Sequence, residues 1–259
     1  MTETEILEKL EELREVRAPA GLRANTLLAT GLADAYFPLE TPLGRLYVAH
    51  NPRGLSAVLH ARSPQDFERA FQAELGRLAV PQDPPPKLEA TLREWLRGDH
   101  RHKLRFDLRG LGEFQQAVLF KALEIPYGQI RPYSWIAREI GRPKAVRAVG
   151  TALAHNPIPL FIPCHRVVRT DGHLGNYSLI GPEAKRTVLE AEGVAVDDLV
   201  RLADSGIRYF GSDTTHIFCF PTCRYNKTLT PRHKVQFTSE AAARAAGYRP
   251  CKICKPAVA

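Results

Sequence analysis

The chain has 259 residues, of which 44% are hydrophobic and 25% are charged. This is the composition of a soluble globular protein with room for one large domain or two to three small ones. It contains no run of about 18 apolar residues, which excludes a membrane-spanning helix, and its acidic N-terminus does not resemble a signal peptide. We therefore expect a cytoplasmic protein with reduced thiols.

The charge of the chain is unevenly distributed. Net charge is +8, but residues 1–40 carry four Lys/Arg against eight Asp/Glu, whereas residues 206–259 carry nine against two. A basic C-terminal segment favours a polyanionic partner, and nucleic acid over membrane because no amphipathic basic helix is evident. The alternative is a basic soluble protein without such a partner.

The first expected element is an amphipathic helix over residues 2–17. Thr2 and Glu5 fit a capping box. Apolar residues recur along one face of the helix, at Ile6, Leu7, Leu10, Leu13 and Val16. The pattern fits a docking helix and a short coiled-coil partner equally well.

The next part of the chain reads as a small α/β supporting domain. Apolar runs at 43–50 and 55–60 flank Asn51-Pro52-Arg53-Gly54, which is a hairpin signal. Ser63-Pro64 is typical of a helix start, and residues 104–108 predict a further strand. No reactive constellation is evident here.

A helix-turn-helix is expected after residue 112. Helices over Ser134–Ile140 and Lys144–Leu153 are separated by the turn Gly141-Arg142-Pro143, a pattern typical of this DNA-binding motif. The second helix is expected to carry Lys144 and Arg147. The alternative is a helical hairpin that binds nothing.

Cys164 and His165 form a candidate nucleophile and base within Pro163–Val168. A thiolate attacks best when an imidazole can accept its proton, although a cysteine beside an apolar run is commonly a buried hydrophobe. Glu192 shares the apolar stripe of a following helix, at Ala184, Val188 and Glu192. It points either inward to a hydrogen-bonded partner such as a histidine or out to solvent.

Together these residues resemble the C-terminal domain of the O6-alkylguanine-DNA alkyltransferases, over residues 112 to 193. The similarity rests on Tyr133, Arg147-Ala148-Val149-Gly150, Asn156-Pro157, Pro163-Cys164-His165-Arg166-Val167-Val168, Gly175-Asn176-Tyr177-Ser178 and Glu192-Gly193. The resemblance implies that Cys164 irreversibly accepts the alkyl group of O6-alkylguanine. It further implies that His165 deprotonates Cys164 through a water, that Glu192 holds the histidine tautomer and that Tyr133 donates a proton towards the guanine.

The resemblance also implies a DNA-binding set. Arg147 would enter the base stack, and Asn156 would tie the helix-turn-helix to the reactive loop. Val167 (through its backbone) and Ser178 would contact the guanine, and Tyr177 would belong to the binding-site loop. The implied partner is double-stranded DNA that contains O6-alkylguanine.

One loop departs from the family. Leu179-Ile180-Gly181-Pro182 is one residue longer than the usual glycine-containing loop beside the guanine pocket, which leaves the tolerated alkyl size open.

A different class of function is a non-repairing protein that only binds alkylated DNA. The family's non-catalytic relatives lack the reactive cysteine, whereas Cys164 is present.

The C-terminal end carries four of the five cysteines, at Cys219, Cys223, Cys251 and Cys254. The C-x3-C and C-x2-C pairs suit a tetrahedral zinc site, and disulfides are disfavoured inside cells. We expect one Zn²⁺ and no organic cofactor. A module of this size cannot build a large core, so the metal is expected to hold it together.

This end resembles the zinc-binding domain of the Ada-type adaptive-response proteins. The similarity rests on Phe210-Gly211, Thr214-Thr215, Ile217-Phe218-Cys219, Pro221, Cys223 and Ala246-Gly247-Tyr248-Arg249-Pro250-Cys251-Lys252-Ile253-Cys254. The resemblance implies that Cys219 is a second methyl acceptor, for methylphosphotriesters of the DNA backbone. A purely structural zinc site is the alternative. His216 and Phe220 depart from the family, and no regulatory role is carried over.

The expected architecture is α+β with a winged-helix-like alkyltransferase domain, in a chain that acts as a monomer without membrane contact. The expected parts are an N-terminal helix and linker (1–30), a supporting domain (31–110), a catalytic and DNA-binding domain (111–196) and a zinc domain (205–259).

Overall fold

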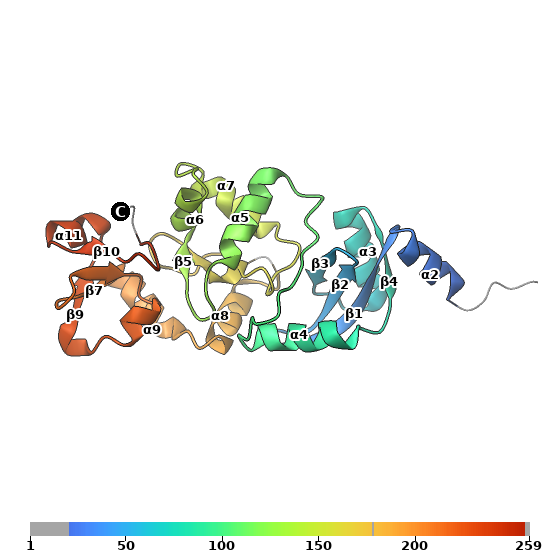
Figure 1. Ribbon diagram of the computed structural model, residues 1–259, viewed down its shortest axis with the longest axis horizontal. Helices are drawn as coiled ribbons and strands as arrows, with labels where there is room; N and C mark the ends of the chain where they lie inside the picture. The colour runs from blue at the N-terminus through green and yellow to red at the C-terminus, as the bar shows by residue number, and fades with distance from the viewer. Residues whose placement is uncertain (1–20, 178, 257–259) are drawn as a thin grey trace, which may run out of the picture.

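The computed structural model describes residues 21–177 and 179–256, so the helix expected over 2–17 lies outside the described residues. Figure 1 shows three parts in a row along the long axis: a sheet with helices at the N-terminal end, a central group of helices and a sheet at the C-terminal end. The expected α+β class is confirmed.

A mixed sheet in the order β3-β2-β1-β4 forms the N-terminal part. Neighbouring strands are antiparallel except for β4, which runs parallel to β1. The helices and strands here are α2 (Leu22–Ala29), β1 (Ala33–Thr41), β2 (Gly44–Asn51), β3 (Gly54–Leu59), α3 (Pro64–Leu75), β4 (Leu78–Pro81) and α4 (Pro86–Leu96).

Strand alternation buries the two faces of this sheet against different partners. Tyr36 and Tyr47 pack against Phe67 and Phe71 of α3, and α3 begins at the expected place because Ser63 Oγ accepts a hydrogen bond from Asp66 N. The opposite face joins the core of the central part. Burial of each phenylalanine contributes about 1.5–3 kcal/mol.

The central part carries the helix-turn-helix and the cysteine loop. Two short parallel strands, β5 and β6, join its two halves. The elements are α5 (Glu113–Leu123), β5 (Arg131–Pro132), α6 (Tyr133–Glu139), α7 (Val146–Ala154), the 3-10 turn η1 (Cys164–Arg166), β6 (Val167–Val168), α8 (Pro182–Ala191) and α9 (Val196–Asp204).

The C-terminal part is a second mixed sheet in the order β10-β8-β7-β9. Its own core is small, with Phe218, Phe237 and Ala243 buried. The elements are β7 (Tyr209–Ser212), β8 (Ile217–Cys219), α10 (Arg224–Lys227), the 3-10 turn η2 (Pro231–His233), β9 (Lys234–Phe237), α11 (Glu240–Ala245) and β10 (Arg249–Pro250).

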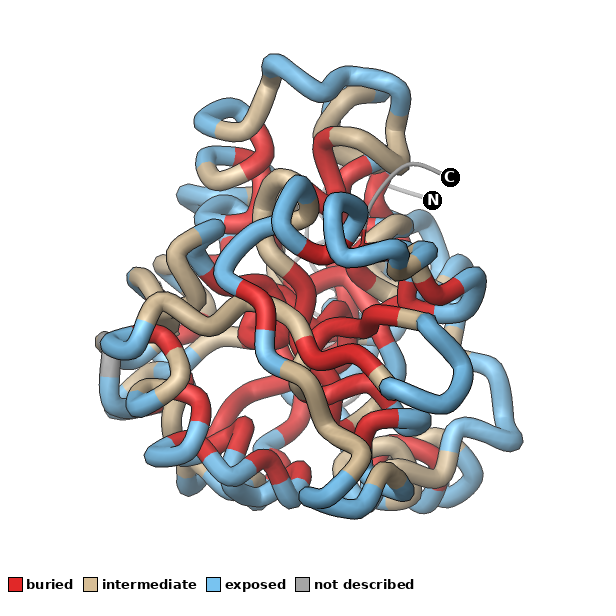
Figure 2. The backbone as a smooth tube through the Cα atoms, turned by 90° about the vertical axis from the view of Figure 1, so that its left-hand side faces the viewer, coloured by how far each residue is buried: buried red, intermediate tan, exposed pale blue. Residues whose placement is uncertain are grey.

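One cluster of buried side chains runs from the N-terminal sheet through the central helices to the four cysteines. Figure 2, viewed from the C-terminal end, shows buried backbone in the interior and exposed loops around it. The three parts therefore pack as one body. Within the described ranges, no helix has both the length and the apolar character that a membrane span requires.

Two local expectations were wrong. Lys144 precedes α7 instead of lying on it, because the helix begins at Val146. Residues 104–108 form no strand, and only Phe106 makes an isolated bridge to Leu55. The sheet instead takes its fourth strand from β4, which the sequence reading did not anticipate.

Candidate active site and metal centre

Cys164 lines an open cleft of about 540 Å³. It begins the single turn η1 directly after Pro163, and only 6% of its surface is exposed. The cleft is lined from α6, α7 and the loop before residue 178, by Tyr133, Arg147, Gly150, Asn176 and Tyr177 among others. Tyr133, Arg147 and Tyr177, which the sequence singled out, thus share one cleft with the cysteine.

Asn156 connects the end of the helix-turn-helix to the cysteine. Its Nδ2 donates hydrogen bonds to Cys164 Sγ at 3.2 Å and to Ile162 O at 2.9 Å. Its Oδ1 accepts a hydrogen bond from Ile158 N at 3.0 Å. One buried amide therefore fixes the loop that precedes the sulfur and stabilises the thiolate by donating to it.

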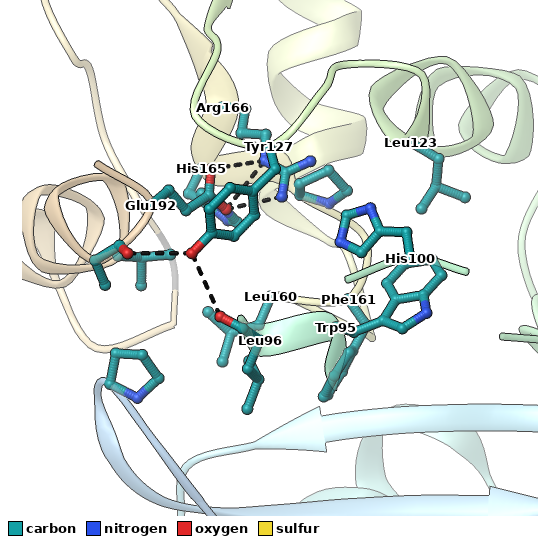
Figure 3. Close-up of a pocket in the computed structure, with 14 residues that line it drawn as sticks. Trp95, Leu96, His100, Leu123, Tyr127, Leu160, Phe161, His165, Arg166 and Glu192 are labelled. Atoms are coloured by element: carbon teal, nitrogen blue, oxygen red, sulfur yellow. Dashed lines mark hydrogen bonds and ion pairs between the residues drawn. The ribbon is translucent and has the colours of Figure 1, made fainter. Parts of the chain in front are cut away.

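Behind the cysteine, Glu192 is the centre of a buried hydrogen-bond network (Figure 3). Glu192 Oε1 lies 2.7 Å from His165 Nε2. The guanidinium of Arg166 donates three bonds of 2.8–3.0 Å to the same carboxylate, and Gly128 N donates a fourth at 3.0 Å. Of the two orientations left open for Glu192, the structure has the inward one.

This network fixes the charge state of its members. Burial acts to raise the pKa of Glu192, but the hydrogen bonds and charges of His165 and Arg166 prevail and hold it at about 2. Burial lowers the pKa of His165 below 6.5, against the opposing effect of Glu192. At neutral pH a neutral imidazole therefore donates Nε2–H to an ionised carboxylate.

His165 Nδ1 is consequently the basic nitrogen of the ring. It is buried, and within the described part of the chain it has no hydrogen-bond partner. The imidazole is therefore held in one tautomer, and the lone pair of Nδ1 is free. Because Cys164 is the preceding residue, this nitrogen is suited to accept a proton from its thiol.

Lys185 and Arg166 are the site residues to which the sequence reading gave no role. Lys185 is fully buried on α8 and donates from Nζ to Val167 O at 2.5 Å and Leu174 O at 2.6 Å. Burial lowers its pKa to about 8, and the charge of Cys164 opposes this shift. Lys185 lies seven residues before Glu192 and therefore on the inward face of the helix, but this spacing alone does not show that an ammonium is buried there.

The charge of the Cys164 sulfur is set by opposing effects. Burial raises the pKa of Cys164, whereas the hydrogen bond from Asn156 and the charge of Lys185 lower it. The thiol is therefore protonated at rest and needs a base to become nucleophilic. Asn156 and Lys185 then favour the thiolate once the proton has left.

Two tyrosines complete the cleft. Burial raises the pKa of Tyr133, with a further contribution from the charge of Cys164, so Tyr133 remains a proton donor at neutral pH. The ring of Tyr177 packs edge-on against His165 with centroids 6.4 Å apart. Ser178, the remaining predicted guanine contact, lies outside the described residues.

The outer wall of the cleft is helix α7. Arg147 is exposed at its first turn, next to exposed Ala148. At Gly150 a side chain would meet no atom within 4 Å, so the helix presents open space on the side of the cleft. A large ligand can approach this surface closely.

The N-terminal part contacts the His165–Glu192 network and the loop before Cys164. Trp95 and His100 stack at 4.4 Å and line a small cavity with His165 and Glu192 (Figure 3). Val58 N of β3 donates to Pro157 O at 2.8 Å. The supporting sheet thus packs directly on the loop that leads to Cys164.

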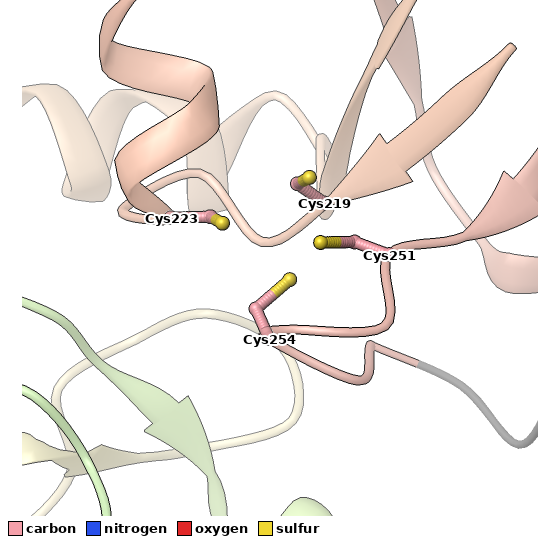
Figure 4. A group of neighbouring side chains, drawn as sticks. All are labelled: Cys219, Cys223, Cys251 and Cys254. Carbon is pink, nitrogen blue, oxygen red and sulfur yellow. The ribbon is translucent and has the colours of Figure 1, made fainter. Parts of the chain in front are cut away.

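The four C-terminal cysteines form a second site. Their Sγ atoms all lie within 4.8 Å of one another, all four residues are buried and none forms a disulfide. Figure 4 shows the side chains converging from the end of β8, the start of α10 and the turn after β10. Four thiols at this spacing fit the donor set of a tetrahedral zinc centre.

Two of these cysteines line a cleft of about 550 Å³. Cys219 and Cys251 lie in its wall and are each 5% exposed, whereas Cys223 and Cys254 are fully buried. The cleft also contains basic side chains from Arg249 and Lys252. The two residues that depart from the Ada pattern are His216, with a φ of 51°, and Phe220, which is buried.

Comparison with known proteins matches a described family to each of the two parts of the chain that carry these sites. A family model described as "6-O-methylguanine DNA methyltransferase, DNA binding domain" matches residues 113–194, and "Metal binding domain of Ada" matches residues 203–257. The methylated-DNA–protein-cysteine methyltransferase of Mus musculus is 34% identical over 173 residues, which cover 61% of this chain and 81% of the mouse protein. The chain belongs to this methyltransferase family.

A second sequence relative and a solved structure are also similar to this chain. The "Bifunctional transcriptional activator/DNA repair enzyme Ada" of Escherichia coli (strain K12) is 37% identical over 153 residues, 56% of this chain and 42% of that protein. A crystal structure of Mycobacterium tuberculosis OGT in complex with DNA superposes with a TM-score of 0.51 at 33% identity, covering 64% of this chain and 99% of the other.

Proposed function

We propose that this methyltransferase repairs DNA by transferring the methyl group of O6-methylguanine irreversibly to Cys164. The observation that carries the proposal is the position of the sulfur. It lines the same cleft as Arg147 and Gly150 of α7, it accepts a hydrogen bond from Asn156, and the charge of buried Lys185 acts on it. These surroundings suit a nucleophile better than a packing residue.

The reaction begins with removal of the thiol proton. His165 Nδ1 accepts it through a water, and Glu192 stabilises the imidazolium that forms because it is already ionised and hydrogen-bonded to Nε2. The resulting thiolate retains the stabilising contacts of Asn156 and Lys185.

The thiolate then attacks the methyl carbon. A sulfur–carbon bond forms, the bond between the carbon and O6 breaks, and its electron pair leaves with the guanine. Tyr133 donates a proton to the guanine as this charge develops, and solvent later returns one to the phenol. A thioether is stable to hydrolysis, so each molecule acts once.

A methyl carbon inside a stacked duplex cannot be reached, so the base must leave the helix. The exposed Arg147 at the mouth of the cleft is the proposed side chain that fills the vacated space. Ala148 and Gly150 leave room for the DNA backbone along α7. The carbonyl of Val167 and the hydroxyl of Ser178 are the proposed contacts to the extruded base.

Intact-mass measurement tests the first step. The native chain, mixed with an equimolar duplex that contains one O6-methylguanine, is expected to gain one methyl group, on the peptide that contains Cys164. A matched duplex with unmodified guanine should leave the mass unchanged. Folded protein that binds the modified duplex without any mass gain would instead identify a non-repairing lesion-binding protein.

The second site is proposed to hold one zinc ion through Cys219, Cys223, Cys251 and Cys254. A bound zinc keeps its cysteine ligands as thiolates. Of the four, only Cys219 and Cys251 line the basic cleft, and Cys219 stands at the acceptor position implied by the Ada resemblance. We assign Cys219 as a second acceptor, for methylphosphotriesters.

In this step the Cys219 sulfur attacks the methyl carbon, the oxygen–carbon bond breaks, and a phosphodiester anion leaves. A neutral triester approaches a thiolate cluster more easily than an anionic diester does. The zinc-loaded chain is expected to gain one methyl on the peptide containing Cys219 from a duplex whose only lesions are methylphosphotriesters. Cys164→Ser should retain this gain. If protein of verified zinc content gains no methyl group from this duplex, the zinc site has a structural role only.

A further inference from the structure

Arg131 is a buried cation of β5 to which neither proposed reaction assigns a role. It is 3% exposed. Its guanidinium donates to Ile130 O and to Gln129 Oε1, both at 2.7 Å. Within the described residues, no Asp or Glu makes an ion pair with Arg131, although buried charges in proteins are generally paired.

The aromatic rings that contact Arg131 come from both the central part and the C-terminal metal-binding part. Its guanidinium carbon lies 5.3 Å from the ring centroid of Phe220, the residue after Cys219, and 5.9 Å from that of Trp135. Burial lowers the pKa of Arg131, and the charges that act against this shift are those of all four cysteines. The guanidinium of Arg131 thus lies against the segment that carries Cys219 and Cys223.

Further contacts hold the two domains together around this charge. Ile130 N donates a buried hydrogen bond of 2.9 Å to Thr222 Oγ1, one residue before Cys223. At the edge of the interface, Arg138 donates to Lys255 O, and Lys255 Nζ pairs with Glu139. The segment between the first two cysteines is therefore anchored on residues 129–131.

The same segment is bonded to the active-site loop. Arg131 of β5 is the register partner of Val167 in β6, and Pro132 is the partner of Val168. Val167 lies three residues after Cys164, and its carbonyl accepts the hydrogen bond of Lys185. One two-stranded ribbon consequently lies between the cysteine cluster and the methyl-accepting cysteine.

We propose that Arg131 is the counter-ion of the metal-loaded cysteine cluster and that this ion pair positions β5 and β6. Loading of the C-terminal metal site therefore stabilises the Cys164 loop in the neighbouring domain. Four thiolates and one divalent cation carry two net negative charges, so the loaded cluster compensates a buried guanidinium.

This inference rests on the metal site proposed above, and the tests use the full chain with its metal content measured. Amide hydrogen exchange is compared before and after the metal is removed with a chelator under reducing conditions. We expect exchange in residues 129–132 and 164–168 to become faster by about tenfold or more. Strands β1 and β2, which are remote from the cluster, should change by less than about twofold.

Variants separate the charge of Arg131 from its packing. Arg131→Met is expected to release metal to a chelator about tenfold faster than the native chain, because the cluster loses its counter-ion. Arg131→Lys keeps the charge and should remain within about threefold of the native rate. The matched control Arg138→Met removes an arginine from the rim of the same interface and should remain within about twofold.

The outcomes distinguish this inference from the proposed function. Unchanged exchange in 164–168 after verified metal removal would refute the coupling while leaving the metal site intact. Equal metal release from Arg131→Met and Arg138→Met would refute the role of Arg131. A folded native chain that binds no metal would overturn both proposals. If Arg131→Met does not fold, the exchange experiment on the native chain still decides.

Discussion

Glu192→Gln is expected to lower the free energy of unfolding by about 3–5 kcal/mol, the usual effect of removing one partner from a buried ion pair. The substitution leaves Arg166 buried without its carboxylate and removes the anion that orients His165. Methyl transfer should also slow by roughly 10²-fold, because the base loses the group that stabilises its charged form. Urea unfolding and single-turnover mass spectrometry measure the two effects.

The pH dependence of stability tests the same network. The pKa of His165 is lowered on folding, so below about pH 6.5 the unfolded chain binds a proton that the folded chain does not. The pKa of Glu192 falls from 4.5 to about 2 on folding, so its contribution of about 3 kcal/mol is present above pH 4.5 and is lost towards pH 2. Acidification therefore destabilises the native chain in both windows.

Glu190→Gln is the matched control. Glu190 lies on α8, two residues before Glu192, but it is exposed, and its ion pair is with Arg186. Its loss should therefore change stability by no more than about 0.5 kcal/mol. Any metal released at low pH affects both variants alike, so their difference isolates Glu192. Equal unfolding curves for the two variants would show that the buried network contributes nothing.

Short-range patterns predicted the parts of the site that depend on local sequence. The spacing of the four cysteines predicted that they form one cluster, because two close pairs of thiols can supply one tetrahedral centre. The structure has this cluster. The inward stripe of α8 placed Glu192 on the buried side but did not decide its orientation. Glu192 points inward because Arg166 and Gly128, from other segments of the chain, donate hydrogen bonds to its carboxylate.

Residues whose role depends on distant carbonyls or charges were not recognisable. Lys185 is buried because Val167 O and Leu174 O receive its ammonium, and nothing in the residues around it shows this. Arg131 is buried because a metal domain some 90 residues later packs on it. A charged residue in a sequence is normally solvated, so only the tertiary structure reveals these two exceptions.

The fold shows the same limit. Strand β4 (Leu78–Pro81) is short and lies between a helix and a proline-rich segment, and the sequence did not predict it as a strand. It becomes a strand because the edge of β1 offers a parallel partner. Lys144 was placed on a helix because apolar residues follow it, yet the chain continues through a turn until Val146. Element boundaries depend on such pairings more than on propensity.

Cys164→Ser is expected to abolish methyl transfer from O6-methylguanine, with a rate loss of more than about 10³-fold. A serine hydroxyl is far less acidic than a thiol, and the contacts of Asn156 and Lys185 that favour a thiolate cannot ionise an alcohol at neutral pH. The substitution removes little volume, so the fold and the cleft should persist. Single-turnover transfer and binding to the lesion duplex are measured in parallel.

Binding separates the two functions that this site could support. A repair protein whose Cys164 is the acceptor should lose transfer and keep affinity for the lesion duplex within about threefold, because Arg147 and the α7 surface are unchanged. Cys164→Ser also offers a trap, since it holds the extruded base without consuming it. Transfer that persists in this variant, with the methyl group on another residue, would move the acceptor away from Cys164 and refute the mechanism derived from the cleft.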